Sequence, residues 1–250
     1  MQNTQDIIVK KSLYIALFSA LLTILPPIIV GGADWIFALG FVSIIAFFSS
    51  LGVAWMFHAR AKKLQSLIDG ERLLARWQLD SQQKERYVNY MFEAQRSKNK
   101  ALFTIMVVMF VLIFGIFIAV IEDDAKMPMF IMMVGSIVFL SFFALGMPYY
   151  YRQSNRKGDG EILIGDKFAY VNGYFHNWDF PLSGLSDVKV IDEPFYGISL
   201  SYYYTDRTLR NYYQMLIPAN QDIELEKVIE TMLEANPKVK KKKRSADANH

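Results

Sequence analysis

Four long segments of this chain contain no aspartate, glutamate, lysine or arginine. They are Ser12–Ala33, Trp35–Phe57, Ala101–Ile121 and Met127–Tyr151. Each is longer than the roughly 20 helical residues needed to cross the hydrocarbon core of a bilayer. A helix that is apolar all round has no polar face to turn towards water, which excludes an ordinary soluble core. The sequence therefore predicts four transmembrane helices, arranged as two hairpins.

Basic residues lie on one side of these segments. Lys10 and Lys11 precede the first segment, and the loop His58–Lys100 carries ten lysines and arginines. The outer turns Gly31–Asp34 and Glu122–Lys126 together carry one lysine and four acidic residues. Because cytoplasmic loops carry the excess of Lys and Arg, both termini and the long loop are predicted to be cytoplasmic. The first segment is too long for a signal peptide and is expected to be a retained anchor.

The hydrophobic pattern changes beyond the fourth segment. Short runs rich in β-branched and aromatic residues are separated by turn residues such as Asn172-Gly173, which suits a tight hairpin. One amphipathic helix is predicted for Asp222–Ala235, with Ile223, Val228, Met232 and Ala235 on its inner face and Asn236-Pro237 at its end. The expected fold is a membrane α-helical part followed by a cytoplasmic, mainly β domain of about six strands with one C-terminal capping helix.

Three stretches of the chain can be compared with known families. They are "YFHNWDFPLSGLSDVKVI", "MLIPAN" with the acidic helix after it, and "GERLLARWQLDSQQKERYVNYMFEAQRSKNK". These stretches resemble bacterial multi-pass membrane proteins that carry a C-terminal pleckstrin-homology-like (PH-like) domain, over about Gly70–Lys100 and Gly158–Ala235. The resemblance implies a PH-like barrel held at a bacterial cytoplasmic (inner) membrane. Phosphoinositide-binding members commonly carry clustered basic residues in the first hairpin turn, whereas this chain has Gly165-Asp166-Lys167, so headgroup binding is not expected there.

The segment "LLARWQLD" has strand periodicity within the long loop. Apolar residues from Leu73 to Leu79, Trp77 among them, alternate with partly polar ones, which is typical of a half-buried strand. A lone strand is not stable in water. Two interpretations stay open: the strand docks on the C-terminal sheet, or the segment lies on the membrane surface with Trp77 as an interfacial anchor. Asp80 or Ser81 is expected to cap a new helix.

Motifs for catalysis and metal binding are missing from the sequence. The histidines His58, His176 and His250 are widely separated, and the chain has no cysteine. Neither a nucleophile elbow, a phosphate-binding loop nor a dinucleotide fingerprint occurs. The carboxylates Asp187, Asp192 and Glu193 favour a solvated strand edge over paired acid–base catalysis. We expect no enzymatic activity, cofactor or metal.

Interaction residues are predicted in three places. Arg207 and Arg210 in "TDRTLRN" suit an anion contact, with a solvated loop as the alternative. The run "KVKKKKR" is expected to be disordered and attracted to anionic lipids, with a merely solubilising tail as the alternative. The aromatic residues between Phe195 and Tyr204 favour internal packing over a peptide-binding edge. The predicted interaction residues are Trp77, Arg207, Arg210, Lys240, Lys241, Lys242, Lys243 and Arg244.

Five parts are predicted for the chain. They are a first transmembrane hairpin (residues 1–57), a cytoplasmic strand–helix loop (58–100), a second transmembrane hairpin (101–151), a PH-like domain (158–237) and a disordered basic tail (238–250). We predict a non-enzymatic integral membrane protein that displays its PH-like module to an unknown protein partner or to the membrane surface, alone or as a homo-oligomer. Nucleic acid is not an expected partner, because no folded basic face adjoins the tail.

Two other functions stay open. A small transporter or channel component with a regulatory barrel is the main alternative, although the four segments lack the ionisable residues that usually mark a transport pathway. The other is a membrane enzyme whose carboxylates form no recognisable group in the sequence.

Overall fold

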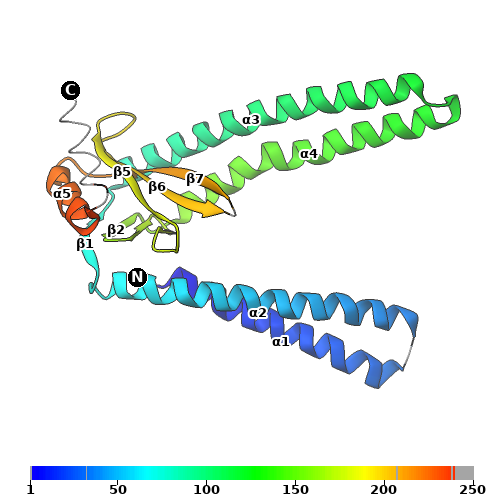
Figure 1. Ribbon diagram of the computed structural model, residues 1–250, viewed down its shortest axis with the longest axis horizontal. Coiled ribbons are helices and arrows are strands. Elements are labelled where there is room, and N and C mark those ends of the chain that lie inside the picture. Colours follow the sequence, from blue (N-terminus) through cyan, green and yellow to red (C-terminus); the bar gives the residue numbers. More distant parts are fainter. Residues whose placement is uncertain (1, 32, 207, 238, 240–250) are drawn as a thin grey trace.

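The computed structural model describes residues 2–31, 33–206, 208–237 and 239 (Figure 1). Residues 238 and 240–250, with most of the predicted basic tail, lie outside that part of the chain. The elements in chain order are α1 (Thr4–Val30), α2 (Asp34–Ile68), β1 (Leu73–Gln78), α3 (Ser81–Val120), α4 (Asp123–Lys157), β2 (Glu161–Gly165), β3 (Phe168–Val171), β4 (Tyr174–Asn177), β5 (Gly184–Ile191), β6 (Gly197–Asp206), β7 (Leu209–Pro218) and α5 (Leu225–Ala235).

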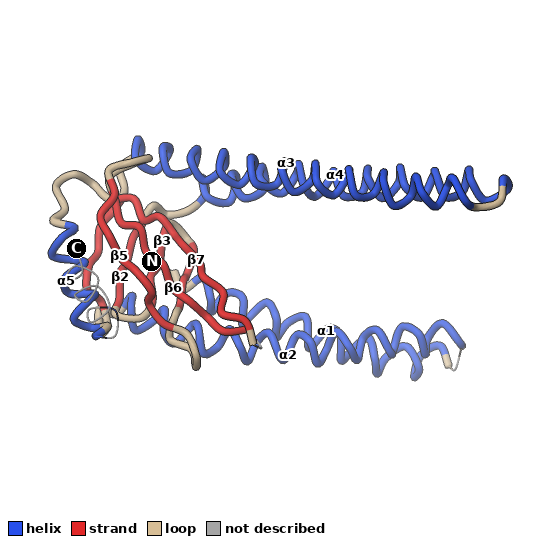
Figure 2. The backbone as a smooth tube through the Cα atoms, turned by 45° about the horizontal axis from the view of Figure 1, so that its top comes forward, coloured by secondary structure: helices blue, strands red, loops and turns tan. Residues whose placement is uncertain are grey.

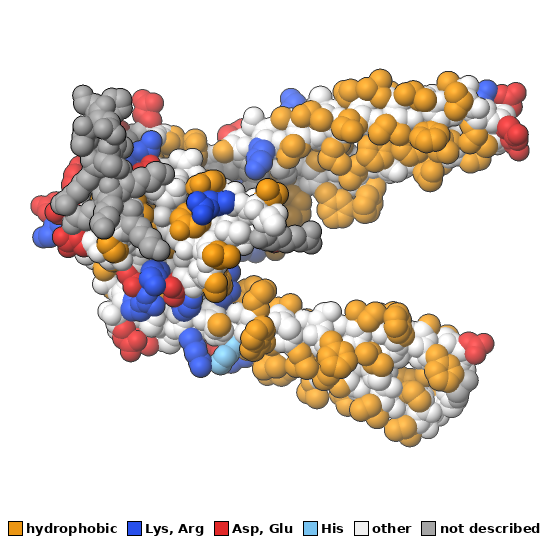
Figure 3. Space-filling model, viewed as in Figure 1, with side chains coloured by type: hydrophobic (Ala, Val, Ile, Leu, Met, Phe, Trp, Pro, Cys, Tyr) orange, Lys and Arg blue, Asp and Glu red, His pale blue; other side chains and the backbone are white. Residues whose placement is uncertain are grey.

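The first four helices are each long and apolar enough to cross a membrane, which confirms the four predicted long apolar helices and indicates a membrane protein. They form two hairpins, α1–α2 and α3–α4, whose turns lie at the end away from the strands (Figure 1). Apolar side chains cover the outside of both hairpins (Figure 3). Phe37 and Phe142, for example, are 70% and 75% exposed. Such a surface is compatible with lipid and unsuited to water.

Side-chain caps fix where two of these helices begin. Asn3 accepts hydrogen bonds from the backbone N–H groups of Gln5 and Asp6 at the start of α1. Asp80 accepts one from the N–H of Gln83, 2.7 Å away, at the start of α3. Such caps satisfy N–H groups that have no partner within the helix. From Asp80, α3 continues without a break for 40 residues through the third apolar segment.

The seven strands form two antiparallel sheets, in the orders β1-β2-β3-β4 and β5-β6-β7 (Figure 2). No backbone ladder joins the two sheets among the described residues, so the expected closed barrel is not formed. At the β1–β7 seam, side chains take the place of a ladder: Trp77 Nε1 donates to the Pro218 oxygen, and Asn220 Nδ2 donates to the Gln78 oxygen. Between β4 and β5, the connecting loop contains Trp178, whose backbone oxygen accepts a hydrogen bond from Ser183 Oγ.

Two hydrophobic cores hold the β domain. The larger lies between the sheets and includes Trp77, Ile162, Trp178, Leu200, Ile217 and Met232. The smaller lies between α2 and the outer face of the first sheet, and comprises Leu64, Leu67, Leu163, Phe168, Tyr170 and Phe175. Strand β2 is buried on both faces for this reason.

The C-terminal helix differs in detail from the prediction. It begins at Leu225, and its buried residues are Leu225, Ile229 and Met232. Of the predicted inner residues, Met232 is fully buried, Ile223 and Val228 are partly buried, and Ala235 is exposed. The cause is the turn before the helix, where the Ile223 N–H donates to the Asn220 oxygen and the Ile223 oxygen accepts from the Tyr196 hydroxyl.

Candidate functional site

β1 is part of the first sheet, which decides between the two interpretations of "LLARWQLD". It pairs with β2 in antiparallel register, with Trp77 opposite Ile162. The Trp77 side chain lies in the larger core and is 7% exposed. Docking on the C-terminal sheet is therefore the interpretation that the structure supports. The α3–α4 hairpin is consequently an insertion between two adjacent strands of one sheet.

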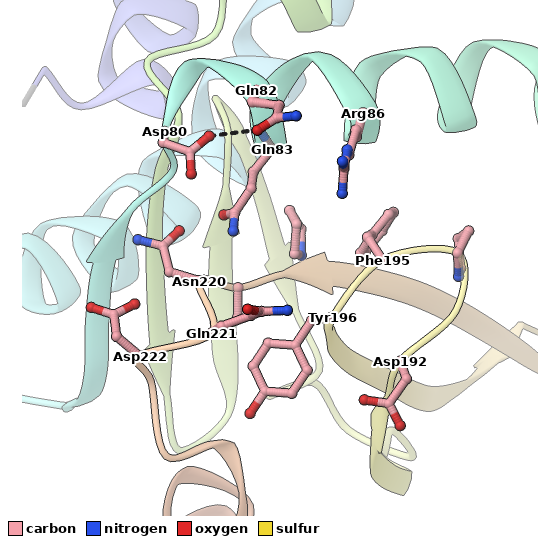
Figure 4. A pocket seen from close by; sticks show the side chains of 13 residues that line it. Asp80, Gln82, Gln83, Arg86, Asp192, Phe195, Tyr196, Asn220, Gln221 and Asp222 are labelled. Carbon is pink, nitrogen blue, oxygen red and sulfur yellow. Dashed lines mark hydrogen bonds between the residues drawn. The ribbon is translucent and has the colours of Figure 1, made fainter.

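A polar pocket lies at the first turn of α3, close to the end of β1 (Figure 4). Its volume is about 680 Å³, and three segments line it: the start of α3, the β5–β6 loop and the β7–α5 link. Gln83 and Arg86 point from α3 towards the segments that carry Asn220, Gln221 and Phe195 (Figure 4). The volume falls within the roughly 300–1,000 Å³ of ligand sites.

The pocket contains two acceptors without donors. Gln83 Oε1 and Asn220 Oδ1 are buried and accept no hydrogen bond from the residues that the structure describes. The orientation of Asn220 is set by its Nδ2, which donates to the Gln78 oxygen at 3.2 Å. Buried polar atoms usually have a partner. Both side chains line the pocket, so a small rotation of either amide would present its oxygen to an N–H or O–H donor of a ligand.

The pocket wall combines an aromatic support with both signs of charge. Phe195 packs edge-on against Tyr87 and Tyr90 of α3, with ring centres 6.0 and 5.8 Å away. Arg86 and Asp192 lie on opposite sides of the opening (Figure 4). A ligand with donors and acceptors in alternation, such as a peptide, matches this lining better than an apolar small molecule.

Of the predicted interaction residues, the structure describes Trp77 and Arg210, and neither lines this pocket. Arg210 lies near the start of β7, with its guanidinium carbon 4.7 Å from the centre of the Tyr203 ring. Arg207 and the tail residues Lys240, Lys241, Lys242, Lys243 and Arg244 lie outside the described residues. The aromatic residues divide between two environments: Phe195 is 9% exposed and Tyr204 is 43% exposed.

His176 faces α3 from β4 and stacks on Tyr213 with ring centres 5.7 Å apart. Burial, followed by the positive charge of Arg60, lowers the pKa of His176 to about 4. The imidazole is therefore neutral at physiological pH. Among the described residues, no group of three or more His, Asp or Glu side chains is arranged to hold a metal ion.

The turn between β2 and β3 has its charges internally paired. Asp166 lies 2.5 Å from Arg72, and Lys167 lies 3.0 Å from Asp179. Lys63 of α2 also reaches Asp179, at 3.1 Å. The turn thus has no free basic cluster to offer a phosphate, and the tie between the β domain and α2 runs through Asp179.

Several positioning residues were missed from the sequence. The i, i+3 spacing of Ala61, Leu64 and Leu67 among polar residues is an available signal for a buried stripe on α2. Gln83 and Asn220 carry no such signal, because isolated amides in polar segments have no periodic pattern.

Comparison with known protein families, curated proteins and solved structures gives no match to this chain.

Proposed function

We propose that this chain is a non-enzymatic protein of the bacterial cytoplasmic membrane, whose PH-like β domain binds a peptide segment of a protein partner in the polar pocket at the start of α3. The arrangement of a four-stranded sheet, a three-stranded sheet and one C-terminal helix supports the PH-like assignment. The observation that carries the function is the pair of unpartnered acceptors, Gln83 Oε1 and Asn220 Oδ1, inside one pocket.

The position of the pocket suits a soluble partner. Ser81 precedes the apolar run at Ala101 by twenty helical residues, or about 30 Å along α3 at 1.5 Å per residue. The pocket therefore stands clear of the headgroup region. Peptide N–H groups are the donors that the two free oxygens require, and the Arg86 guanidinium offers donors to peptide carbonyls.

Binding at this pocket would be transmitted to the membrane. Tyr87 and Val88 of α3 are buried in the larger core, one turn beyond the pocket. Leu64 and Leu67 of α2 are fixed to the opposite face of the first sheet. A partner that shifts the first turn of α3 would change the orientation of the second helical hairpin relative to the first.

Site-specific photo-crosslinking in native membranes tests this function. A photoreactive residue at Gln221, on the pocket rim, should give one crosslinked product of defined mass. The matched control is Lys227, which is also exposed but lies on α5 outside the pocket. Arg86→Glu should abolish the Gln221 product, while Lys227→Glu should leave it unchanged.

Two outcomes count against the proposal. Equal products at Gln221 and Lys227 would indicate random collision, and an unchanged product in Arg86→Glu would exclude the pocket. The transporter alternative has a separate test: the purified chain in sealed liposomes should not increase the flux of ions or small solutes.

A further inference from the structure

The β6–β7 hairpin extends beyond the sheet to which it belongs. β5 pairs with β6 only as far as Gly184 and Tyr203, whereas β6 and β7 remain paired out to Asp206 and Leu209. The outer residues form a two-stranded projection, here called the hairpin tip (residues 204–206 and 209–212). In Figure 1 it extends to the same side of the strands as the two helical hairpins and its end lies between them, while Figure 2 shows that it runs obliquely to the helices.

Large apolar side chains are exposed on both faces of the tip. Ile198 and Ile217, at the base of the hairpin, are fully buried, whereas Leu209 is 71% and Tyr212 is 64% exposed. The register places Tyr212 opposite Tyr203 on one face, and Leu209 with Tyr204 on the other. A flat partner surface would cover only one of these faces. A medium that surrounds the tip covers both.

The reach of the tip brings it towards the level of the membrane surface. Tyr213 shares a small pocket with Tyr90 and Ala94 of α3. Leu209 lies four residues farther along the strand, or up to about 13 Å at roughly 3.3 Å per residue. An α-helix covers that distance in about nine residues. Going from Tyr213 to Leu209 therefore takes the hairpin from the level of Ala94 towards the level of Ala101, where the charge-free run of α3 begins.

The tip also carries an unneutralised positive charge. Arg210 lies over the Tyr203 ring and has no carboxylate partner among the described residues. Asp206 projects from the opposite face, because it is in register with Leu209 and Arg210 is in register with Thr205. Tyrosine is enriched at membrane interfaces, and arginine there keeps its stem in apolar surroundings and its guanidinium among headgroups.

We propose that the hairpin tip is a membrane anchor of the β domain. Tyr204, Leu209 and Tyr212 occupy the boundary between headgroups and acyl chains of the bilayer that the four helices cross, and Arg210 binds the phosphate of an anionic phospholipid. This anchor is independent of the peptide-binding pocket, which lies beside Pro218 at the other end of β7.

Fluorescence quenching in lipid nanodiscs tests the anchor. The chain has no cysteine, so Leu209→Cys provides a single labelling site in the full-length protein. The control is Lys227→Cys on the exposed side of α5. In discs of phosphatidylcholine and phosphatidylglycerol, a fluorophore at position 209 should be quenched by lipids brominated near the headgroup and protected several-fold from iodide. The fluorophore at position 227 should show the reverse.

Two results would overturn the anchor. One is iodide quenching at position 209 equal to that at 227. The other is protection from iodide without quenching by brominated lipid, which would mean that protein covers the tip. Adding Arg210→Glu to the labelled protein should reduce lipid quenching several-fold in anionic discs and have little effect in discs of pure phosphatidylcholine. If quenching in anionic discs is the same with and without Arg210→Glu, the phosphate contact is rejected. Protease resistance of the β domain serves as the folding control for each variant.

Discussion

Trp77 Nε1 donates a hydrogen bond to the backbone oxygen of Pro218 at 2.9 Å, although 141 residues separate the two. Trp77 belongs to β1, in the loop between the two helical hairpins, and Pro218 ends the last strand. The bond joins the first sheet to the second at a seam where they share no backbone ladder. One buried side chain therefore connects β1, which precedes the inserted α3–α4 hairpin, to the end of the last strand.

Removal of this side chain should destabilise the whole β domain. We expect Trp77→Ala to lower the free energy of unfolding by about 3–5 kcal/mol, as for other buried aromatic side chains. Trp77→Phe keeps a ring but leaves the Pro218 oxygen without its donor, at a cost of about 1–3 kcal/mol. Limited proteolysis should show the β1 segment and the β domain becoming sensitive together. Trp55→Ala is the control, since Trp55 is 82% exposed on α2; equal sensitivity of both alanine variants would contradict the role of Trp77.

The smaller core should control the attachment of the first helical hairpin. Leu67 of α2 is fully buried against the first sheet. Leu67→Ala should cost about 2–5 kcal/mol and release α2 from the domain, while the larger core remains folded. A disulfide introduced between α2 and the first sheet should then form more slowly in the variant. The comparison is Leu51→Ala in the apolar run of the same helix, which should leave the rate unchanged.

A buried asparagine should be required where α4 meets the β domain. Asn172 Nδ2 donates to the Asn155 oxygen at 2.8 Å, and its Oδ1 accepts from the Gly160 N–H at 2.9 Å. Its φ of 48° lies in the left-handed region. Asn172→Ala loses both bonds and adds backbone strain of roughly 1–2 kcal/mol, whereas Asn172→Gly loses the bonds only. The alanine variant should therefore have the lower midpoint in thermal unfolding; the reverse order would show that side-chain volume, not backbone conformation, dominates.

Acid should weaken the packing around His176. The folded protein keeps this group neutral, with a pKa of about 4, whereas the unfolded chain binds a proton near the ordinary value of 6.5. The stability of the fold with neutral His176 is fully present above pH 6.5, and it is lost as the pH falls towards 4 because the unfolded chain then binds the proton more tightly. A shift of this size corresponds to on the order of 3 kcal/mol. Thermal unfolding from pH 7.5 to 4.5 should show the loss, and His176→Asn should reduce its slope. His58→Asn should keep the wild-type slope, and a loss of slope in that variant would assign the effect elsewhere.

The α3–α4 turn and the C-terminal end of the chain should report opposite sides of the membrane. The N-terminus and the β domain lie at one end of the helical hairpins, and both turns lie at the other (Figure 1). With the basic residues retained inside, a reporter fused at Asp124 should be external, and one fused after Pro237 should be cytoplasmic. An external reading after Pro237 would reject the proposed orientation and, with it, a cytoplasmic partner.

Local patterns in the sequence were sufficient for the elements but not for their contacts. The charge-free runs predict the membrane helices because of their length and the lack of a polar face. The alternation from Leu73 to Leu79 predicts a strand because it repeats with the two-residue period of a strand. The Trp77–Pro218 bond and the approach of Gln83 to Asn220 join segments far apart in the chain, and neither leaves a periodic trace. The predicted barrel was wrong for a related reason: strand patterns do not say whether the outer strands meet through backbone or side chains.

The insertion of α3–α4 between β1 and β2 sets an order of events during synthesis. β1 leaves the ribosome two membrane crossings before its partner β2, so it has no strand to pair with while the second hairpin is being inserted. β1 can pair with β2 only if both crossings are completed and the chain returns to its original side of the membrane. A chain whose second hairpin fails to insert correctly would expose Trp77 and the edge of β2 to quality-control proteases. Completion of the first sheet therefore has to follow the insertion of α3 and α4.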